Sequence, residues 1–449
     1  MKHLFSRLSP AQKIILSFLL VIFCGSLLLS LPWVQTESSQ AGYLDHLFTA
    51  VSMVCVTGLF TRSVVDTYNV WGQLLCMLLI QIGGLGILTF IGFFTMESRK
   101  KLSLKDRRIL RDSFSYGHNR TLGQFVRSIF ITTFSIEGLG ALLLMIRFIP
   151  KFGLRKGIFN SIFLAVSAFC NAGFDNFGND SLLGLQTDVL VNITLALLII
   201  TGGLGFMVWF DLATKLGGKQ KGLHFHTKVV LLLTAGLLVF GTVTSLWTEY
   251  NNPGTIGNLS FGDKLLVSFF QTVSMRTAGF SSIDYTAARP VTLFIYLLQM
   301  FLGGAPGGTA GGLKITTFLV LLLFARKEIL GLPHTNMGRR TLAPQLVQKA
   351  FGVTVIFQLT FLLGLLALGL VTDSSHRFIY LIFETVSALA TVGVTANITT
   401  SLNTAGMIVI MLLMFIGRVG PLTLMVSLNY YQPKKATTLH YSKADIMIG

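Results

Sequence analysis

Residues 378–395, FIYLIFETVSALATVGVT, decide the fold because a segment of this kind occurs four times along the chain. The other copies read LDHLFTAVSMVCVTGLF at 44–60, GIFNSIFLAVSAFCNAGF at 157–174 and DKLLVSFFQTVSMRTAGF at 263–280. Each copy has a phenylalanine, then a Val-Ser pair about six residues before a glycine. The glycines Gly58, Gly173, Gly279 and Gly393 recur 115, 106 and 114 residues apart, a period that indicates four large repeated units rather than a solenoid.

Longer apolar runs flank these segments in pairs. Each run has about 20 residues or more, enough for a helix to cross a bilayer. The eight runs are 14–34, 71–96, 126–149, 189–212, 229–247, 292–324, 351–371 and 405–428. The first is too long for the core of a signal peptide, and no small-residue cleavage site follows it. Each quoted segment has only about 12 apolar residues before its glycine, so we expect it to re-enter the membrane rather than cross it.

The predicted fold is therefore an all-α integral membrane protein. It has eight transmembrane helices and four re-entrant pore segments, arranged as four pseudo-symmetric helix–pore–helix repeats around one central pore. The repeats cover residues 1–97, 98–217, 218–335 and 336–449; the third has a broken second helix, and the fourth carries a C-terminal tail.

The composition agrees with a protein whose solvent is mostly lipid. Of the residues, 52% are hydrophobic and only 12% are charged, and the mean hydropathy is +0.70. A soluble domain carries roughly 25% charged residues.

The net charge of +17 is distributed unevenly across the predicted membrane. One side, with both termini and the loops 97–127, 211–228 and 326–349, holds 24 of the 35 basic residues but 6 of the 18 acidic ones. Basic loops stay in the cytoplasm, so we expect both termini there, in a cell membrane. The basic stretch 97–111 is interpreted as a topology signal facing the lipid bilayer, and no nucleic-acid-binding module accompanies it.

The four segments end in small residues that suit a filter of backbone carbonyls. They carry no ring of carboxylates at the glycines, so selection by charged side chains is not expected. The alternative is that each glycine only ends a helix; four copies in the same setting favour the filter. The predicted ion-binding residues are Val56, Thr57, Gly58, Asn171, Ala172, Gly173, Thr277, Ala278, Gly279, Thr391, Val392 and Gly393.

The apolar run 292–324 contains LGGAPGGTAGGLKITT, which cannot continue a helix, because each glycine costs about 1 kcal/mol and proline about 3 kcal/mol. We predict a loop inside the membrane that lines the pathway. Its residues are Gly303, Gly304, Ala305, Pro306, Gly307, Gly308, Thr309, Gly311 and Gly312. The sparser glycines at 83–86 and 202–205 are interpreted as packing faces between helices.

The motifs VTGL, NAGF, RTAGF and TVGVT resemble the four pore loops of the Ktr/Trk/HKT potassium-transporter superfamily, over nearly the whole chain. The short N-terminus resembles KtrB-type membrane subunits. The resemblance implies potassium as the transported ion and no cofactor bound by this chain. It also implies a gating loop at 303–312, a homodimer, and a cytosolic nucleotide-binding ring of the KtrA type as partner.

Charged residues inside apolar segments are candidates for function. Arg418 matches a family arginine near the pore, and its five donors suit the carbonyls of the 303–312 loop, so we expect it to act as a gate latch. Lys314 follows that loop, and Arg276 precedes the third glycine. For Glu137 and Glu384 we favour structural hydrogen bonds.

The predicted function is ion translocation in a potassium-uptake system, with sodium dependence left open. The alternative is a less selective monovalent cation or sodium transporter of the same architecture. A membrane-embedded enzyme is a distant alternative, since no HExxH or GxSxG motif occurs.

Overall fold

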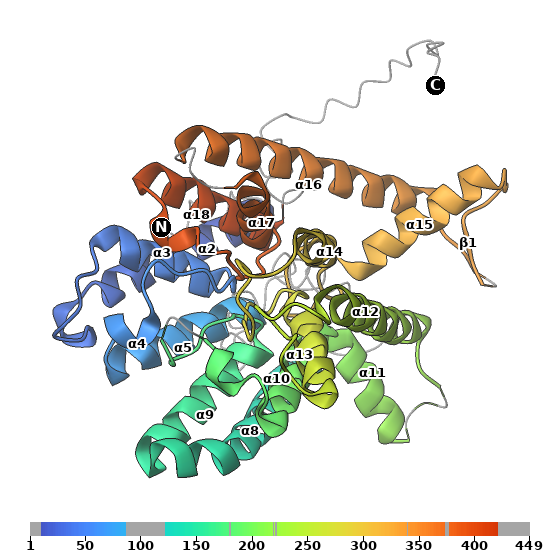
Figure 1. The fold of residues 1–449 in the computed structure, drawn as a ribbon. Helices are drawn as coiled ribbons and strands as arrows, with labels where there is room; N and C mark the ends of the chain where they lie inside the picture. Colours follow the sequence, from blue (N-terminus) through green and yellow to red (C-terminus); the bar gives the residue numbers. More distant parts are fainter. Residues whose placement is uncertain are drawn as a thin grey trace, which may run out of the picture.

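The computed structural model describes residues 10–86, 122–178, 181–218, 220, 222–338, 340–372 and 377–420. Within them, a group of three main helices occurs four times along the chain. Each group has a long helix, a middle helix that ends shortly before one of the four repeated glycines, and another apolar helix. Figure 1 shows the four groups placed around a common centre, where the loops that follow the middle helices meet.

The helix bounds are as follows. The first helices of the groups are α2 (Pro10–Leu29), α8 (Leu122–Phe152), α12 (Phe225–Glu249) and α16 (Pro344–Val371). The middle helices are α3 (Tyr43–Val54), α9 (Leu154–Phe169), α13 (Phe261–Ser274) and α17 (Phe378–Leu389). The last helices are α5 (Val70–Leu85), α10 (Val189–Gly203), α14 (Pro290–Phe301) and α18 (Thr404–Val419).

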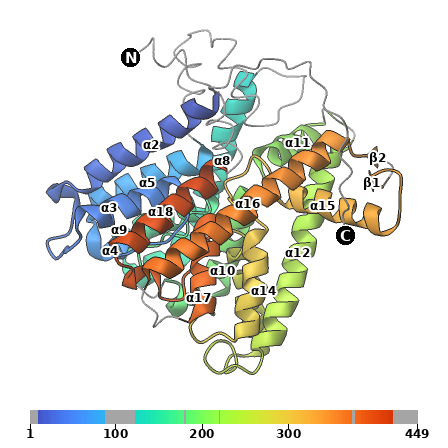
Figure 2. The same ribbon diagram turned by 90° about the horizontal axis from the view of Figure 1, so that it is seen from above.

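The remaining elements connect helices within a group or join one group to the next. They are α4 (Val64–Thr67), α11 (Phe206–Leu216), α15 (Ile315–Ile329), the 3-10 turns η1 (Pro32–Val34), η2 (Leu183–Leu185) and η3 (Thr399–Ser401), and the strands β1 (Asn336–Met337) and β2 (Arg340–Thr341). The strands form a small antiparallel hairpin. In Figures 1 and 2 this hairpin lies at one edge of the molecule, where it joins α15 to α16.

Four helices of the described residues, α2, α8, α12 and α16, are long and apolar enough to cross a membrane, and the bent pair α10–α11 would make a fifth. Their outward faces carry apolar side chains: Leu20 and Phe23 on α2, and Leu363 and Leu370 on α16, are all more than half exposed. Such faces fit lipid as solvent. The predicted runs 71–96 and 405–428 extend beyond the described residues, so a total of eight spans stays a prediction.

Three of the four last helices begin at polar caps that the sequence supplies. The side chains of Asn69, Asp188 and Asn403 accept hydrogen bonds from the first backbone amides of α5, α10 and α18. Pro290 starts α14, where a missing backbone N–H costs nothing. These caps fix where each helix begins relative to the loop before it.

The run 189–212, predicted as one helix, is broken. The chain bends by 98° between α10 and α11, and Gly205 has a φ of 88°. Two other last helices also end at a glycine in the left-handed region, α5 at Gly86 (φ 80°) and α18 at Gly420 (φ 91°). Glycine reaches this region without a steric penalty, so the helices stop there. Breaks in the predicted apolar runs are therefore not confined to the 303–312 loop.

The packing interpretation of the glycines at 83–86 and 202–205 also agrees with the structure. A Cβ on Gly83 would lie 2.3 Å from the Val54 carbonyl oxygen, and one on Gly202 would lie 1.9 Å from the Phe169 carbonyl oxygen. Those carbonyls are the last of α3 and α9. Glycine thus lets two last helices approach the ends of the middle helices of their own groups.

Candidate functional site

The four middle helices end in the same way, shortly before the predicted glycines. The residue two positions before each glycine has a positive φ: 56° at Val56, 57° at Asn171, 64° at Thr277 and 52° at Thr391. A non-glycine residue in this region is uncommon and costs about 1–2 kcal/mol. The same unfavourable conformation at four matching positions requires support from the surrounding structure.

The serines of three of the four Val-Ser pairs provide part of that support by accepting a hydrogen bond from a backbone amide. Ser52 Oγ accepts a hydrogen bond from the Gly58 amide (3.2 Å), and Ser387 Oγ accepts one from the Gly393 amide (3.1 Å). Ser167 Oγ accepts from the Phe174 amide at 2.9 Å. The spacing of these serines was visible in the sequence, but their role in holding the turn was not predicted.

Replacing Ser387 with alanine is expected to lower the free energy of unfolding by about 1–3 kcal/mol, because the buried Gly393 amide loses its acceptor. Thermal unfolding in detergent, followed by the loss of monodisperse protein, measures this. The matched control is Ser30→Ala, since Ser30 Oγ donates to Leu27 O at an exposed helix end. Equal unfolding temperatures for both variants would show that the Ser387 hydroxyl does not support the turn.

The four glycines meet at the centre of the molecule. A Cβ on Gly58 would lie 2.8 Å from Ala172 O and 3.1 Å from the Gly173 Cα. One on Gly393 would lie 1.9 Å from Thr57 O. The same close approach occurs between the second and third segments, where Gly173 lies against Ala278 O. It occurs again between the third and fourth segments, where Gly279 lies against Val392 O. The carbonyl before each glycine therefore lies against a glycine of another segment, and no side chain fits between them.

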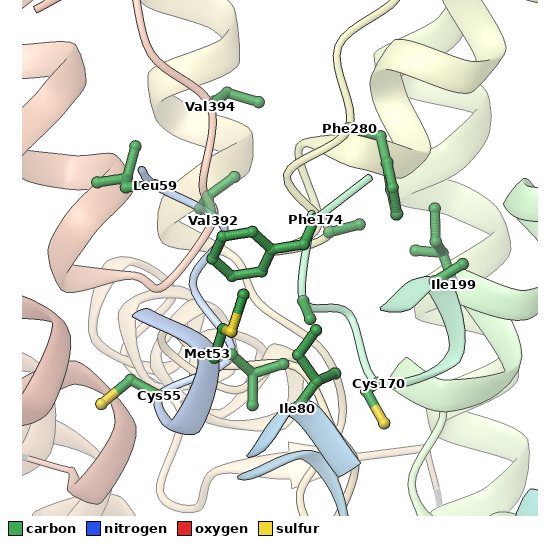
Figure 3. Close-up of a cluster of buried hydrophobic side chains, with 14 of the residues drawn as sticks. Met53, Cys55, Leu59, Ile80, Cys170, Phe174, Ile199, Phe280, Val392 and Val394 are labelled. Carbon is green, nitrogen blue, oxygen red and sulfur yellow. The ribbon is translucent and has the colours of Figure 1, made fainter. Parts of the chain in front are cut away.

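An apolar shell surrounds these segments. Figure 3 shows the Phe174 ring beside Val392, with Cys55 and Cys170 pointing away from each other.

Glu384 lies on α17, which leads into the fourth segment. It is buried and accepts hydrogen bonds from the hydroxyls of Thr395 (2.6 Å) and Thr399. A structural role for this glutamate thus agrees with its contacts.

Two other charged residues predicted as candidates bond to neighbouring helices. Glu137 on α8 accepts from Gln81 Nε2 on α5 at 3.0 Å. Arg276 donates to Thr234 Oγ1 on α12 at 3.4 Å. The hydrogen bonds of both side chains therefore join helices, which fits a structural role.

Residues 303–312 form a non-helical loop between α14 and α15, as predicted. The two ends of the loop are tied together, since Gly303 N donates to Leu313 O (2.9 Å). The loop also joins the broken α10–α11 pair: Ala305 N donates to Gly203 O at 2.9 Å, and Thr309 N donates to Gly202 O at 3.2 Å. The backbone groups freed by the break in α10 thus bond to the backbone of the loop.

Arg418 reaches this loop from α18. Its Nη1 donates to Thr309 O at 2.5 Å, and its Nη2 bonds to Gly83 O and Gly84 O at the end of α5. Lys314 Nζ donates to Ala310 O at 2.7 Å. The hydrogen bond from Arg418 to a loop carbonyl agrees with the predicted contact. Its hydrogen bonds to the carbonyls of α5 were not predicted.

The chain is similar to known cation transport proteins over almost its whole length. The model of the TrkH family, described as cation transport protein, matches residues 7–438. The chain is 38% identical over 446 residues to the Ktr system potassium uptake protein B of Bacillus subtilis, covering 99% of this chain and 97% of that protein. It is also 38% identical over 453 residues to the potassium/sodium uptake protein NtpJ of Enterococcus hirae, covering 100% of this chain and 99% of that protein.

The fold is similar to a solved structure as well. The crystal structure of the potassium transporter TrkH from Vibrio parahaemolyticus superposes with a TM-score of 0.72, over 93% of this chain and 84% of that one. The sequences share 17% identity, so this likeness concerns the fold alone.

Proposed function

The chain belongs to the TrkH family of cation transport proteins and is a membrane subunit of the Ktr/Trk type, and we propose that it conducts potassium through the four glycine segments. The printed names of both curated relatives describe potassium uptake. These relatives are transporters, and this supports a transport role over the enzyme alternative.

One observation carries the proposal: four glycines from four repeats meet with neighbouring carbonyl oxygens between them. Carbonyl oxygens can replace the hydration shell of a monovalent cation. The ends of four middle helices also point their negative dipole ends at this place. The twelve residues from Val56–Gly58, 171–173, 277–279 and 391–393 would then form the selectivity filter.

The 303–312 loop supports a second part of the proposal, a gate. The loop is buried against the second, third and fourth segments and is tied by Arg418. Irregular backbone in a membrane is tolerated where protein buries it or where it lines a pathway. We assign the loop as the gate and Arg418 as its latch.

The membrane arrangement is proposed as eight spans with four re-entrant segments, in four repeats bounded at 1–97, 98–217, 218–335 and 336–449. The partner proposal rests on the relatives named as parts of a Ktr system, which implies more than one component. We propose a homodimer of this chain, with a cytosolic nucleotide-binding ring as regulator.

A less selective cation transporter is the second candidate. Val56, Asn171, Thr277 and Thr391 occupy the same position in the four segments but are of three residue types, so the four segments are not identical there. The relative named a potassium/sodium uptake protein also favours this alternative.

Purified protein in liposomes tests the proposal. We expect potassium to enter against a protein-free control and to be preferred over sodium when both are present. Equal flux of the two ions would favour the less selective alternative. Flux no greater than in protein-free liposomes would refute transport by this chain alone.

Cysteine labelling tests the proposed membrane topology. That topology rests on the unequal number of basic residues on the two sides of the membrane. We expect Ser38→Cys to react with an impermeant reagent from outside and Ser103→Cys to react only from inside; Ser103 lies outside the described residues. Labelling of both from one side would refute the orientation.

A further inference from the structure

Each middle helix holds the chain beyond its own glycine by a side-chain hydrogen bond. On α3, Asp45 Oδ1 accepts a hydrogen bond from Thr61 Oγ1 at 2.7 Å. On α9, Asn160 Oδ1 accepts one from Asn176 Nδ2 at 2.8 Å. Thr61 and Asn176 are each the third residue after a glycine, so both bonds tie the same position of a segment back to its helix.

The third and fourth segments have the same kind of bond. Gln271 Nε2 on α13 donates to Ser282 Oγ at 2.8 Å, and Ser282 is again the third residue after its glycine. Glu384 on α17 accepts from Thr395 Oγ1 at 2.6 Å and from the Thr399 hydroxyl. Thr395 is the second residue after Gly393. We call these four contacts clips.

The chain after each glycine depends on such side-chain bonds. Residues 59–63, 174–178, 280–289 and 394–398 belong to no helix or strand, so no regular backbone pairing fixes their course. The serine bonds described above hold amides at or next to three of the glycines, and the clips hold the chain two or three residues further on. The carbonyl oxygens of the segments lie beside the chain fixed in this way. Groups that bond to an ion's ligands orient those ligands.

The clip of the fourth segment has the most hydrogen bonds. Glu384 and Thr399 are 0% exposed, and the carboxyl group of Glu384 accepts from two hydroxyls. Thr395 Oγ1 also accepts from the Ile398 amide at 3.2 Å, so the same hydroxyl joins the helix to the turn of the backbone. Removing one member of a buried network leaves its partners unsatisfied.

We propose that the clips position the carbonyl oxygens of the glycine segments and thereby set the preference for potassium over sodium. Glu384 is then the positioning residue of the fourth segment, and it acts through Thr395 and Thr399. This inference rests on the proposed function and adds residues that determine specificity without being ion ligands.

Competition between potassium and sodium for uptake into liposomes, per molecule of folded protein, tests the fourth clip. Thr395→Val removes the hydroxyl at nearly constant volume, and we expect the preference for potassium to fall about fivefold. Thr395→Ser keeps the hydroxyl and is expected to retain the preference of the parent. A hydroxyl that served stability alone would change the unfolding temperature and leave the ion preference as it is.

Two further variants separate the clip from packing. Thr385→Val is the matched control, because the buried Thr385 hydroxyl donates to Leu381 O at 2.7 Å within the same helix, and its ion preference is expected to match the parent. Glu384→Met removes the acceptor, and we expect a fall of about tenfold. Adding Thr395→Val to Glu384→Met should then change the preference no further, since the hydroxyl acts through the carboxyl group.

The outcomes are distinct. If the parent prefers potassium and Thr395→Val keeps that preference, the clip inference is wrong and the proposed function stands. If Thr395→Val does not fold, Thr61→Val tests the first clip, and an unchanged preference there overturns the inference. A shift in Thr385→Val equal to that in Thr395→Val would show that packing of α17 sets the preference instead. A parent without potassium flux would refute the proposed function and the inference with it.

Discussion

Replacing Gly58 with serine is expected to lower the preference for potassium over sodium by about tenfold, and replacing it with aspartate is expected to abolish useful uptake. Gly58 has a φ of 102°, which side chains rarely adopt. A Cβ there would lie 2.8 Å from Ala172 O, closer than real Cβ contacts, so that carbonyl must move. A shift of about 1.4 kcal/mol in ion discrimination gives the tenfold change.

Competition between potassium and sodium for uptake into liposomes measures this change, per molecule of folded protein. Gly153→Ser is the matched control, because Gly153 has a similar φ of 81° but no atom within 4 Å of an added Cβ. It should carry the backbone strain without disturbing the glycine segments. Unchanged ion preference and affinity in both Gly58 variants would remove Gly58 from the filter.

Local signals in the sequence predicted much of this arrangement. The apolar stretch of about 12 residues before each glycine predicted a short middle helix, and the density of glycine and Pro306 located the 303–312 loop. Arg418 was expected at the loop from the resemblance to the Ktr/Trk/HKT superfamily, and its five donors suit the carbonyls of the loop. The first two inferences depend on residues close together in the sequence, whereas the placement of Arg418 depends on the family resemblance.

Other features depend on contacts that the sequence does not specify. A few glycines in an apolar run suit close packing and a helix end equally well, so the ends at Gly86, Gly205 and Gly420 were not predicted. The contacts of Gly83 with Val54 and of Arg418 with α5 join parts of the chain that only the fold brings together.

The third segment shows how one residue of spacing changes the bonding. Ser274 lies five residues before Gly279, whereas the other three serines lie six residues before their glycines. Accordingly, Ala278 N bonds to the serine carbonyl four residues back, while the matching amides of the other segments bond five back. Ser274 Oγ then donates to Phe280 O at 2.5 Å instead of accepting from an amide. This difference was readable in the sequence.

Deleting residues 305–310 is expected to raise cation flux by about tenfold or more and to reduce its dependence on a cytosolic partner. The deletion is sterically reasonable, because a Cβ on Gly303 would lie 1.9 Å from Gly311 O, so the two ends of the loop already touch. It removes Thr309 and with it the loop carbonyl that Arg418 holds. A closed state that loses these bonds no longer outweighs the open one.

Arg418→Gln tests the same gate without shortening the chain. A hydrogen bond from a charged donor contributes about 1.5–3 kcal/mol, so loss of the bond to Thr309 O should change the ratio of closed to open protein by about tenfold or more. The same variant also loses the bonds to α5, and a fall in stability is expected with it. Flux must therefore be divided by the amount of folded protein.

Flux per folded molecule also distinguishes a loop that closes the pathway from a loop that only interrupts the helix. If the loop only completes the packing of α10, α14 and α18, both changes should lower the folded fraction, and flux per folded molecule should stay at or below that of the parent. If the loop closes the pathway, flux per folded molecule should rise in both variants, and more in the deletion than in Arg418→Gln. A deletion variant that folds normally without higher flux would show that the 303–312 loop is not the gate.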